Sequence, residues 1–231
     1  MSVRSIPDVE RLAEEIVSRL TIEIEASGRH IHLCRADLEA RIIRRVSAAT
    51  IRINPAKYNA PRNRKPYWSA QLNRVKDLSQ PGQFACAERV SLAGPKGELK
   101  NVVILGPERP ESQVEISLTD AVTLGVMPPV RISGDTAGTP GLTVRHGDRA
   151  ITLSHGLIAA KRHIHVTPED AARYGVHDKQ NVRLRCFTAR PLVFGEVEVR
   201  VSPKFATVVH IDYDEANACG FQKGDRGMIL L

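Results

Sequence analysis

The sequence has few aromatic residues, few cysteines and no long apolar run. Only 4% of its 231 residues are Phe, Trp or Tyr, but 42% are hydrophobic, which is enough apolar material for a core. This composition excludes a fibrous or disordered chain and fits one large or two small globular domains. No stretch approaches the roughly 18 to 20 consecutive apolar residues of a membrane-spanning helix, so we expect neither a membrane segment nor a secretory leader.

The four cysteines are scattered along the chain, and no two of them form a Cys-x-x-Cys pair. They are Cys34, Cys86, Cys186 and Cys219. A disulfide framework and a cysteine-based zinc site both depend on recurrent cysteine spacings, which this chain lacks. We therefore expect reduced thiols with structural roles, as in a cytosolic protein.

Acidic residues are missing from one segment, which accounts for the net charge of +7. Residues 41–76 contain ten of the 33 Lys and Arg residues and none of the 26 Asp and Glu residues, so 23 basic residues face 26 acidic ones elsewhere. The positive charge is thus a local feature. It does not by itself indicate a nucleic-acid-binding protein.

The N-terminal residues predict an amphipathic helix within residues 1–20. Its apolar positions follow the helical spacing i, i+3, i+4, i+7 and are Val9, Leu12, Ala13, Ile16, Val17 and Leu20. One interpretation is a helix that packs on the body of the protein or in a dimer. The other is a docking helix that a partner protein recognises.

The rest of the chain contains short β-branched runs separated by glycine and proline, which is typical of antiparallel barrels or sandwiches with a few short helices. The expected strands are Thr21–Ala26, Arg89–Leu92, Asn101–Leu105, Gln113–Ser117, Leu142–Val144, Ala150–Leu153, Asn181–Cys186, Gly195–Val201, Thr207–Asp212 and Gly227–Leu231. A short helix is expected after Thr167, which would cap it, with Pro168 at its first position and Gly175 at its end.

Two pairs of segments in the chain resemble each other in the same order. Gly28–Asp37 matches Lys161–Asp170, and Val114–Ala121 matches Val209–Ala216. A glycine follows each copy of the second pair at the same offset, Gly125 and Gly220. The sequence therefore indicates an internal duplication.

Five of the eight histidines lie in this repeat, and their spacing predicts two metal sites. Residues two apart in an extended segment point to the same side, so His30 with His32, and His163 with His165, each present two imidazoles to one face. The second repeated motif supplies a third ligand per copy, Glu115 in the first and His210 in the second. Three ligands leave coordination positions open, which is typical of catalytic zinc.

Longer motifs extend over nearly the whole chain and identify a family. They are RHIHL at Arg29–Leu33, KDLSQPGQFA at Lys76–Ala85, GPKG at Gly94–Gly97, NVVILGPER at Asn101–Arg109, QVEIS at Gln113–Ser117, the run Pro128–Gly141, RHIHVTPEDA at Arg162–Ala171 and the run Val199–Ala218. In these motifs the chain resembles the phosphate propanoyltransferases, or PduL-type phosphotransacylases. These zinc-dependent enzymes move an acyl group between coenzyme A and inorganic phosphate.

The resemblance implies a role for several residues of this chain. It implies two zinc ions per chain, one held by His30, His32 and Glu115 and the other by His163, His165 and His210. It assigns phosphate binding to Arg109, whose guanidinium suits bidentate recognition of phosphate oxygens, and makes Arg109 and Glu115 the catalytic residues. The implied contacts with coenzyme A are Ser27, Gly28, Lys76, Lys96 and Asn217.

The resemblance also implies a mainly β fold of two β-barrels, capped by short helices, with the N-terminal strand joining the C-terminal barrel. We accordingly expect residues 21–33 and 149–231 to form one barrel. Residues 34–148 would form the other and would include a basic insertion at about 45–72, because family members pass through this region in fewer residues. Val103 stands where the family commonly has a basic residue that contacts coenzyme A.

Three interpretations of the basic insertion remain open: a solvated loop, a contact with coenzyme A or a partner, and nucleic-acid binding through its interleaved arginines and aromatics, which we rank last. For the whole protein, the alternatives to the acyltransferase are a di-metal thioesterase or phosphoesterase and a non-catalytic metal- or nucleic-acid-binding derivative. Metal ions other than zinc also suit imidazole and carboxylate ligands.

Residues 1–20 resemble the encapsulation peptides that direct this family into bacterial microcompartments. The resemblance therefore implies an enzyme of the bacterial cytoplasm, inside a microcompartment, with shell or core proteins as partners of this helix. A homo-oligomer, dimeric or larger, is also expected.

Overall fold

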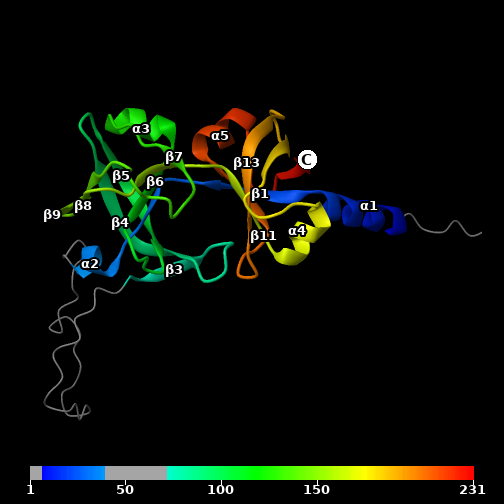
Figure 1. Cartoon of the computed structure of the whole chain (residues 1–231), viewed down its shortest axis with the longest axis horizontal. Helices are drawn as coiled ribbons and strands as arrows, with labels where there is room; N and C mark the ends of the chain where they lie inside the picture. Colours follow the sequence, from blue (N-terminus) through cyan, green and yellow to red (C-terminus); the bar gives the residue numbers. More distant parts are fainter. Residues whose placement is uncertain (1–6, 40–71) are drawn as a thin grey trace, which may run out of the picture.

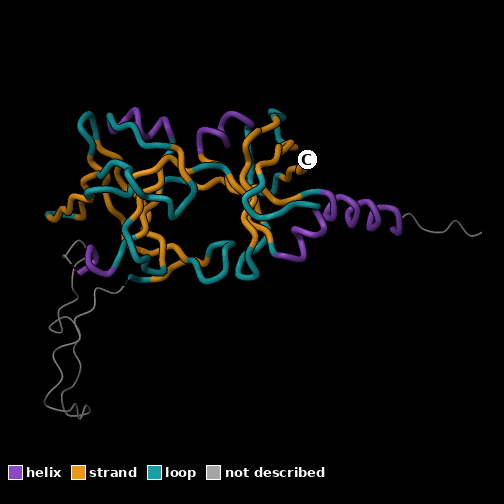
Figure 2. Tube along the Cα trace, viewed as in Figure 1, coloured by secondary structure: helices purple, strands orange, loops and turns teal. Residues whose placement is uncertain are grey.

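The computed structural model describes residues 7–39 and 72–231, and its strands form two units that lie side by side (Figure 1). The expected basic insertion, apart from its last residue Leu72, lies outside the described residues. Short helices lie at the periphery of both units (Figure 2). The mainly β class predicted from the sequence is confirmed.

One unit is a closed barrel of six strands in the order β1-β14-β11-β13-β12-β15. Strand β12 alternates buried and exposed residues, and the buried apolar residues of the barrel form one core cluster that includes Ile24, Ile164, Leu184 and Val199. The strands are β1 Ile22–Ser27, β11 His163–Val166, β12 Asn181–Phe187, β13 Val193–Val201, β14 Val208–Asp212 and β15 Arg226–Leu230.

The other unit is a nine-stranded sheet in the order β7-β10-β6-β2-β5-β4-β8-β9, with β3 paired to β4. It has its own core cluster, which includes Ile31, Leu92, Ile104 and Val144. This sheet curls into a half-barrel without closing, in the place where the sequence predicted the second barrel. The strands are β2 His30–His32, β3 Arg74–Asp77, β4 Phe84–Ala93, β5 Glu98–Gly106, β6 Gln113–Ile116, β7 Val130–Arg131, β8 Leu142–His146, β9 Arg149–Leu153 and β10 Leu157–Ala160.

Within the described residues, the chain crosses between the two units twice, each time just before a histidine pair. The first crossing runs from β1 through Gly28 and Arg29 into β2, and the second runs from β10 through Lys161 and Arg162 into β11. The strand before each crossing pairs within the unit that the chain then leaves. Strand β1 pairs in parallel with β14 of the barrel, and β10 pairs in parallel with β6 of the nine-stranded sheet. Both histidine pairs consequently begin at the boundary between the units.

Strand pairing supports the internal duplication. The histidine strand β2 lies between β5, which is parallel to it, and β6, which is antiparallel. The histidine strand β11 likewise lies between parallel β13 and antiparallel β14. The two similar sequence segments therefore occupy equivalent places in the two units.

Equivalent helices follow β6 and β14, and equivalent ion pairs fix them to the histidine strands. Both α3 (Leu118–Leu124) and α5 (Tyr213–Cys219) begin with a capping box and end at a glycine with positive φ, 73° at Gly125 and 66° at Gly220. Arg29 pairs with Asp120 of α3 at 2.9 Å, and Arg162 pairs with Glu215 of α5 at 2.5 Å.

Two further short helices, α2 (Arg35–Asp37) and α4 (Pro168–Tyr174), directly follow the histidine strands. As predicted, Thr167 caps α4 and Gly175 ends it.

The observed sheet membership differs from the division expected at residues 21–33 and 149–231. The hydrogen-bonded pairing assigns β2, β9 and β10 to the nine-stranded sheet, although all three lie within the ranges expected to form the barrel. Strand β1 pairs within the barrel and strand β10 pairs within the nine-stranded sheet. Each boundary between the units therefore lies at the residues just before a histidine pair.

The expected N-terminal helix is present as α1 (Pro7–Leu20), which projects away from the barrel (Figure 1). Its apolar face is exposed, from 48% at Ile16 to 69% at Val9. This face therefore does not pack on the described part of the chain, which removes the interpretation that it covers the protein body. Among the described residues, none of the helices combines the length and apolar character needed to cross a membrane.

Candidate functional site

The six predicted ligands form two groups of three at equivalent places in the fold. Glu115 on β6 lies directly opposite His30 on β2, and His210 on β14 lies directly opposite His163 on β11. Within each group the ligand atoms lie within 4.8 Å of one another, and every member except the half-buried His210 is buried. Strand pairing therefore brings together what the repeat predicted.

Backbone carbonyls determine which nitrogen the first histidine of each pair offers. Nδ1 of His30 donates to the Gly28 carbonyl at 2.8 Å, and Nδ1 of His163 donates to the Lys161 carbonyl at 2.8 Å. A carbonyl can only accept, so Nδ1 carries the proton and Nε2 stays free to bind a metal. These Nε2 atoms lie 3.4 Å from Glu115 Oε1 and 3.4 Å from His210 Nδ1, respectively.

The second histidine of each pair has a buried nitrogen without a partner. Nδ1 of His32 and Nδ1 of His165 have no hydrogen bond within the described part of the chain. A buried polar atom left unpaired is unfavourable unless a water or ion binds it. Each group thus brings its own free histidine nitrogens close together. In each group this set of three donors fits one zinc ion with coordination positions left open.

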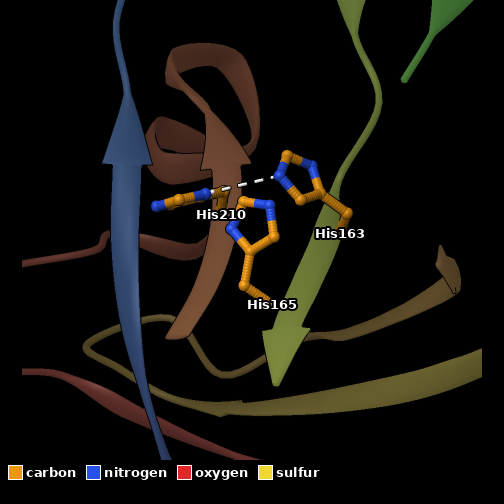
Figure 3. Close-up of side chains that lie close together, drawn as sticks. All are labelled: His163, His165 and His210. Carbon is orange, nitrogen blue, oxygen red and sulfur yellow. Dashed lines mark hydrogen bonds between the residues drawn. The ribbon is translucent and has the colours of Figure 1, made fainter. Parts of the chain in front are cut away.

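The second group is chemically a set of three imidazoles (Figure 3). Burial, reinforced by the neighbouring His210, lowers the pKa of His163 to about 4. Burial and the neighbouring His163 lower the pKa of His165 to about 2. Both imidazoles are therefore neutral at physiological pH, which is the form that binds a metal ion.

The first group instead contains an acid–base pair. Burial disfavours a charged His30, but the Glu115 carboxylate beside it outweighs burial and raises the His30 pKa. Burial would raise the pKa of Glu115, yet His30 holds that pKa well below its usual value. With neutral imidazoles the first group has a charge of −1, whereas the second group has none.

Arg109, which the sequence predicted to bind phosphate, lies beside the first group. Its backbone N–H donates to the Leu33 carbonyl at 3.1 Å, which places it next to the histidine strand. Its guanidinium donates through Nη1 to Ser133 Oγ at 2.8 Å. The remaining guanidinium N–H groups can therefore bind an anion in the cleft.

Gln113 connects Arg109 to the first group, and the sequence did not reveal this role. Its Nε2 donates to Glu115 Oε1 at 2.6 Å and to Ser133 Oγ at 2.9 Å, and its Oε1 accepts from the Gly134 N–H at 2.7 Å. The only signal was its place two residues before Glu115, on the same face of a strand. Gln113 is 1% exposed, so its side chain holds Glu115 and the Ser133–Arg109 pair at fixed positions relative to each other.

Replacing Gln113 by methionine, which keeps its size but removes the amide, is expected to lower kcat/KM for phosphate about 10- to 100-fold, the usual effect of losing a partner of a metal ligand. Affinity of the first group for Zn²⁺ should fall as well. Steady-state kinetics and metal titration measure both. The matched change at exposed Gln222 should alter neither quantity. An unchanged kcat/KM in the Gln113 variant would show that catalysis does not need the Gln113 amide.

A cleft of about 1620 Å³ runs between the two units and contains all six ligands and Arg109. Of the residues expected to contact coenzyme A, Ser27, Gly28, Lys76 and Asn217 line it. Lys96 does not line it: this residue lies in the turn between β4 and β5, where its side chain packs over Gly125. Cationic residues that the sequence analysis did not single out also line the cleft: Arg29, Lys100, Arg200 and Lys223.

Comparison with known proteins shows one family. Residues 68–222 match the phosphate propanoyltransferase family. The chain is 50% identical to a phosphate propanoyltransferase of Enterococcus faecalis, over 99% of this chain and 100% of the relative. It is 47% identical to one of Listeria monocytogenes over 95% of this chain and 93% of the relative, and 43% identical to one of Thermotoga maritima over 88% and 86%, respectively.

Proposed function

The chain belongs to the phosphate propanoyltransferase family and is thus an acyltransferase, and we propose that it uses two Zn²⁺ ions to transfer a propionyl or acetyl group between coenzyme A and inorganic phosphate. The observation that carries the proposal is the pair of three-ligand groups in one cleft beside Arg109. In the reaction a phosphate oxygen forms a bond to the acyl carbon, the carbon–sulfur bond breaks, and the electron pair leaves with sulfur.

The residues of the chain bind and orient the two substrates. Arg109 holds phosphate through paired N–H donors, and Gln113 and Ser133 keep that guanidinium at a fixed place relative to Glu115. When bound, Zn²⁺ would polarise the thioester carbonyl and stabilise the departing thiolate.

Coenzyme A is proposed to lie along the cleft, with its phosphates near the cationic residues at its walls. Lys76 comes from the nine-stranded sheet, and Ser27 and Asn217 come from the barrel, so the coenzyme would bridge both units. Because Lys96 lies outside the cleft, Lys100 is the better-placed cation on this side. It lies three residues before Val103, where the charge common in the family is missing.

The acyl chain is proposed to occupy a small cavity of about 230 Å³ beside His32 and Arg109. Apart from Gln83, its other walls are small or apolar, with Pro81, Gly82 and Pro107 among them. Comparing kcat/KM for acetyl-, propionyl- and longer acyl-coenzyme A tests this placement. A preference for long chains would contradict it.

No covalent acyl-enzyme is needed, and the thiols do not favour one. Burial raises the pKa of Cys86 to about 11 and that of Cys186 to about 12, so neither forms the thiolate nucleophile at neutral pH. Cys34 donates its S–H to Asp37 and does not line the cleft. Direct attack by phosphate on the thioester is the simpler route.

One assay tests the proposed function: release of free thiol from propionyl-coenzyme A, with and without phosphate and with and without a chelator. Release that needs both phosphate and metal supports the transferase. Release without phosphate indicates a di-metal hydrolase instead, and no release indicates a non-catalytic metal-binding derivative.

We further propose that α1 docks on a shell or core protein of a bacterial microcompartment through its exposed apolar face. Deleting residues 1–20 is expected to leave kcat/KM unchanged within about twofold, because the helix lies outside both core clusters. Co-purification with shell proteins should be lost. A single change on the apolar face, Leu12→Glu, should abolish co-purification as the deletion does, whereas Glu14→Gln should not. Shell binding by the truncated chain would contradict the proposal.

A further inference from the structure

The second nitrogen of His210 contacts a carboxylate that no motif singled out. His210 Nδ1 faces His163 Nε2 at 3.4 Å, whereas its Nε2 lies 3.1 Å from Oε2 of Glu25 (Figure 3 shows the His210–His163 contact). Glu25 lies on β1, directly beside His210 on the parallel strand β14. From this geometry we propose that Glu25 is a positioning residue: it fixes the orientation and tautomer of His210 and strengthens the second metal site.

The hydrogen bond determines which His210 nitrogen is free. An ionised carboxylate can only accept, so His210 Nε2 carries the proton and Nδ1 keeps its lone pair toward His163 and His165. A carboxylate behind a metal-binding imidazole raises the basicity of that ligand.

Glu25 also corrects a difference in charge between the two groups. The first group has its own carboxylate, Glu115, whereas the second has three imidazoles. Without a nearby negative charge, a divalent ion in the second group would keep its full +2 charge in a partly buried site. Glu25 supplies from behind His210 the charge that Glu115 supplies within the first group.

The position of Glu25 depends in turn on the other side of the cleft. Ser79, in the turn between β3 and β4, donates its hydroxyl to Glu25 Oε2 at 2.6 Å. The next residue, Gln80, exchanges two hydrogen bonds with the backbone of Ala206 in the barrel, at 3.0 Å and 3.3 Å. The nine-stranded sheet thus holds the carboxylate that orients a ligand of the barrel, so the second metal site depends on contact between the two units.

The inference rests on the proposed function, since it concerns the second of the two metal sites, and Co²⁺ binding tests it independently of turnover. The metal-free full-length chain is titrated with Co²⁺ while its visible absorption is recorded. The unmodified chain should bind two ions. Glu25→Gln should bind the first as before and the second about 10- to 100-fold more weakly, with a changed spectrum for the weaker site.

Two further variants separate positioning from a general effect of charge. Glu23→Gln removes the same charge from the same strand, two residues away, and Glu23 is exposed and makes no side-chain hydrogen bond within the described part of the chain. It should leave both affinities unchanged. Ser79→Ala leaves strand β1 intact and should weaken the second ion by a few-fold, less than Glu25→Gln does.

The outcomes distinguish the two proposals. If the unmodified chain does not bind two ions, the proposed two-metal function fails. If it does, and Glu25→Gln binds the second ion with unchanged affinity, the role of Glu25 is overturned. Equal weakening by Glu23→Gln and Glu25→Gln would also overturn it. If Glu25→Gln lowers the thermal unfolding temperature, its weaker binding could reflect lost stability, and the test then depends on Ser79→Ala. An unchanged affinity of Ser79→Ala for the second ion would overturn the inference.

Discussion

Replacing Arg109 by alanine is expected to lower kcat/KM for phosphate about 100- to 1000-fold, the usual effect of removing one fixed donor at a developing negative charge. The guanidinium lies beside the first group of ligands and is held there by Ser133. Alanine removes the paired N–H donors that would orient phosphate for attack on the acyl carbon. The metal sites should stay intact, because Arg109 is not a ligand, so the variant should still bind two ions per chain.

Lysine at position 109 sharpens this test. It keeps the positive charge but not the planar fork of donors, so we expect it to recover only part of the lost rate. Arg145→Ala, a matched change at an exposed arginine of β8, should leave the kinetics unchanged. An Arg109→Ala enzyme that keeps its kcat/KM for phosphate would show that phosphate binds elsewhere in the cleft.

Replacing Glu115 by glutamine is expected to reduce the metal content from two ions per chain to one and turnover by more than about 1000-fold. Metal ions contribute several kcal/mol of transition-state stabilisation, and each 1.4 kcal/mol corresponds to a factor of ten in rate. The amide has nearly the shape of the carboxylate but lacks its charge, which is the only formal negative charge in the two ligand groups. Metal analysis and thiol release measure the two effects.

Glu111→Gln provides the control for this variant. Its carboxylate lies only four residues earlier, but its side chain is 63% exposed and faces His155. The Glu111→Gln variant should bind two ions and keep full activity. If Glu115→Gln also bound two ions and turned over normally, Glu115 would not be a metal ligand.

The metal ligands could be predicted because their geometry is local and repeated. His30 and His32 share a face in any extended segment, and the second copy at His163 and His165 distinguished the pattern from chance. The third ligands followed from the repeat, and strand pairing then placed Glu115 opposite His30.

Other parts of the site depend on contacts that sequence patterns do not contain. Glu25 looked like an ordinary polar position of an alternating strand, and its partner His210 is 185 residues away. Ser133 lies in a loop, and only the folded chain brings it to Gln113 and Arg109. The likeness to the family indicated that the N-terminal strand joins the C-terminal barrel, but the reciprocal placement of β10 emerged only from strand pairing.

The reciprocal placement of β1 and β10 has a consequence for how such a fold arose. Neither copy of the repeat completes its own sheet: the barrel needs β1 between β14 and β15, and the other sheet needs β10 between β7 and β6. A single ancestral repeat would have had the same deficit, and a second identical chain lending the same strand in return would satisfy it. Gene fusion would then convert a strand-swapped homodimer into one polypeptide. After such a fusion the two equivalent ligand groups could diverge, which would account for Glu115 in one and His210 in the other.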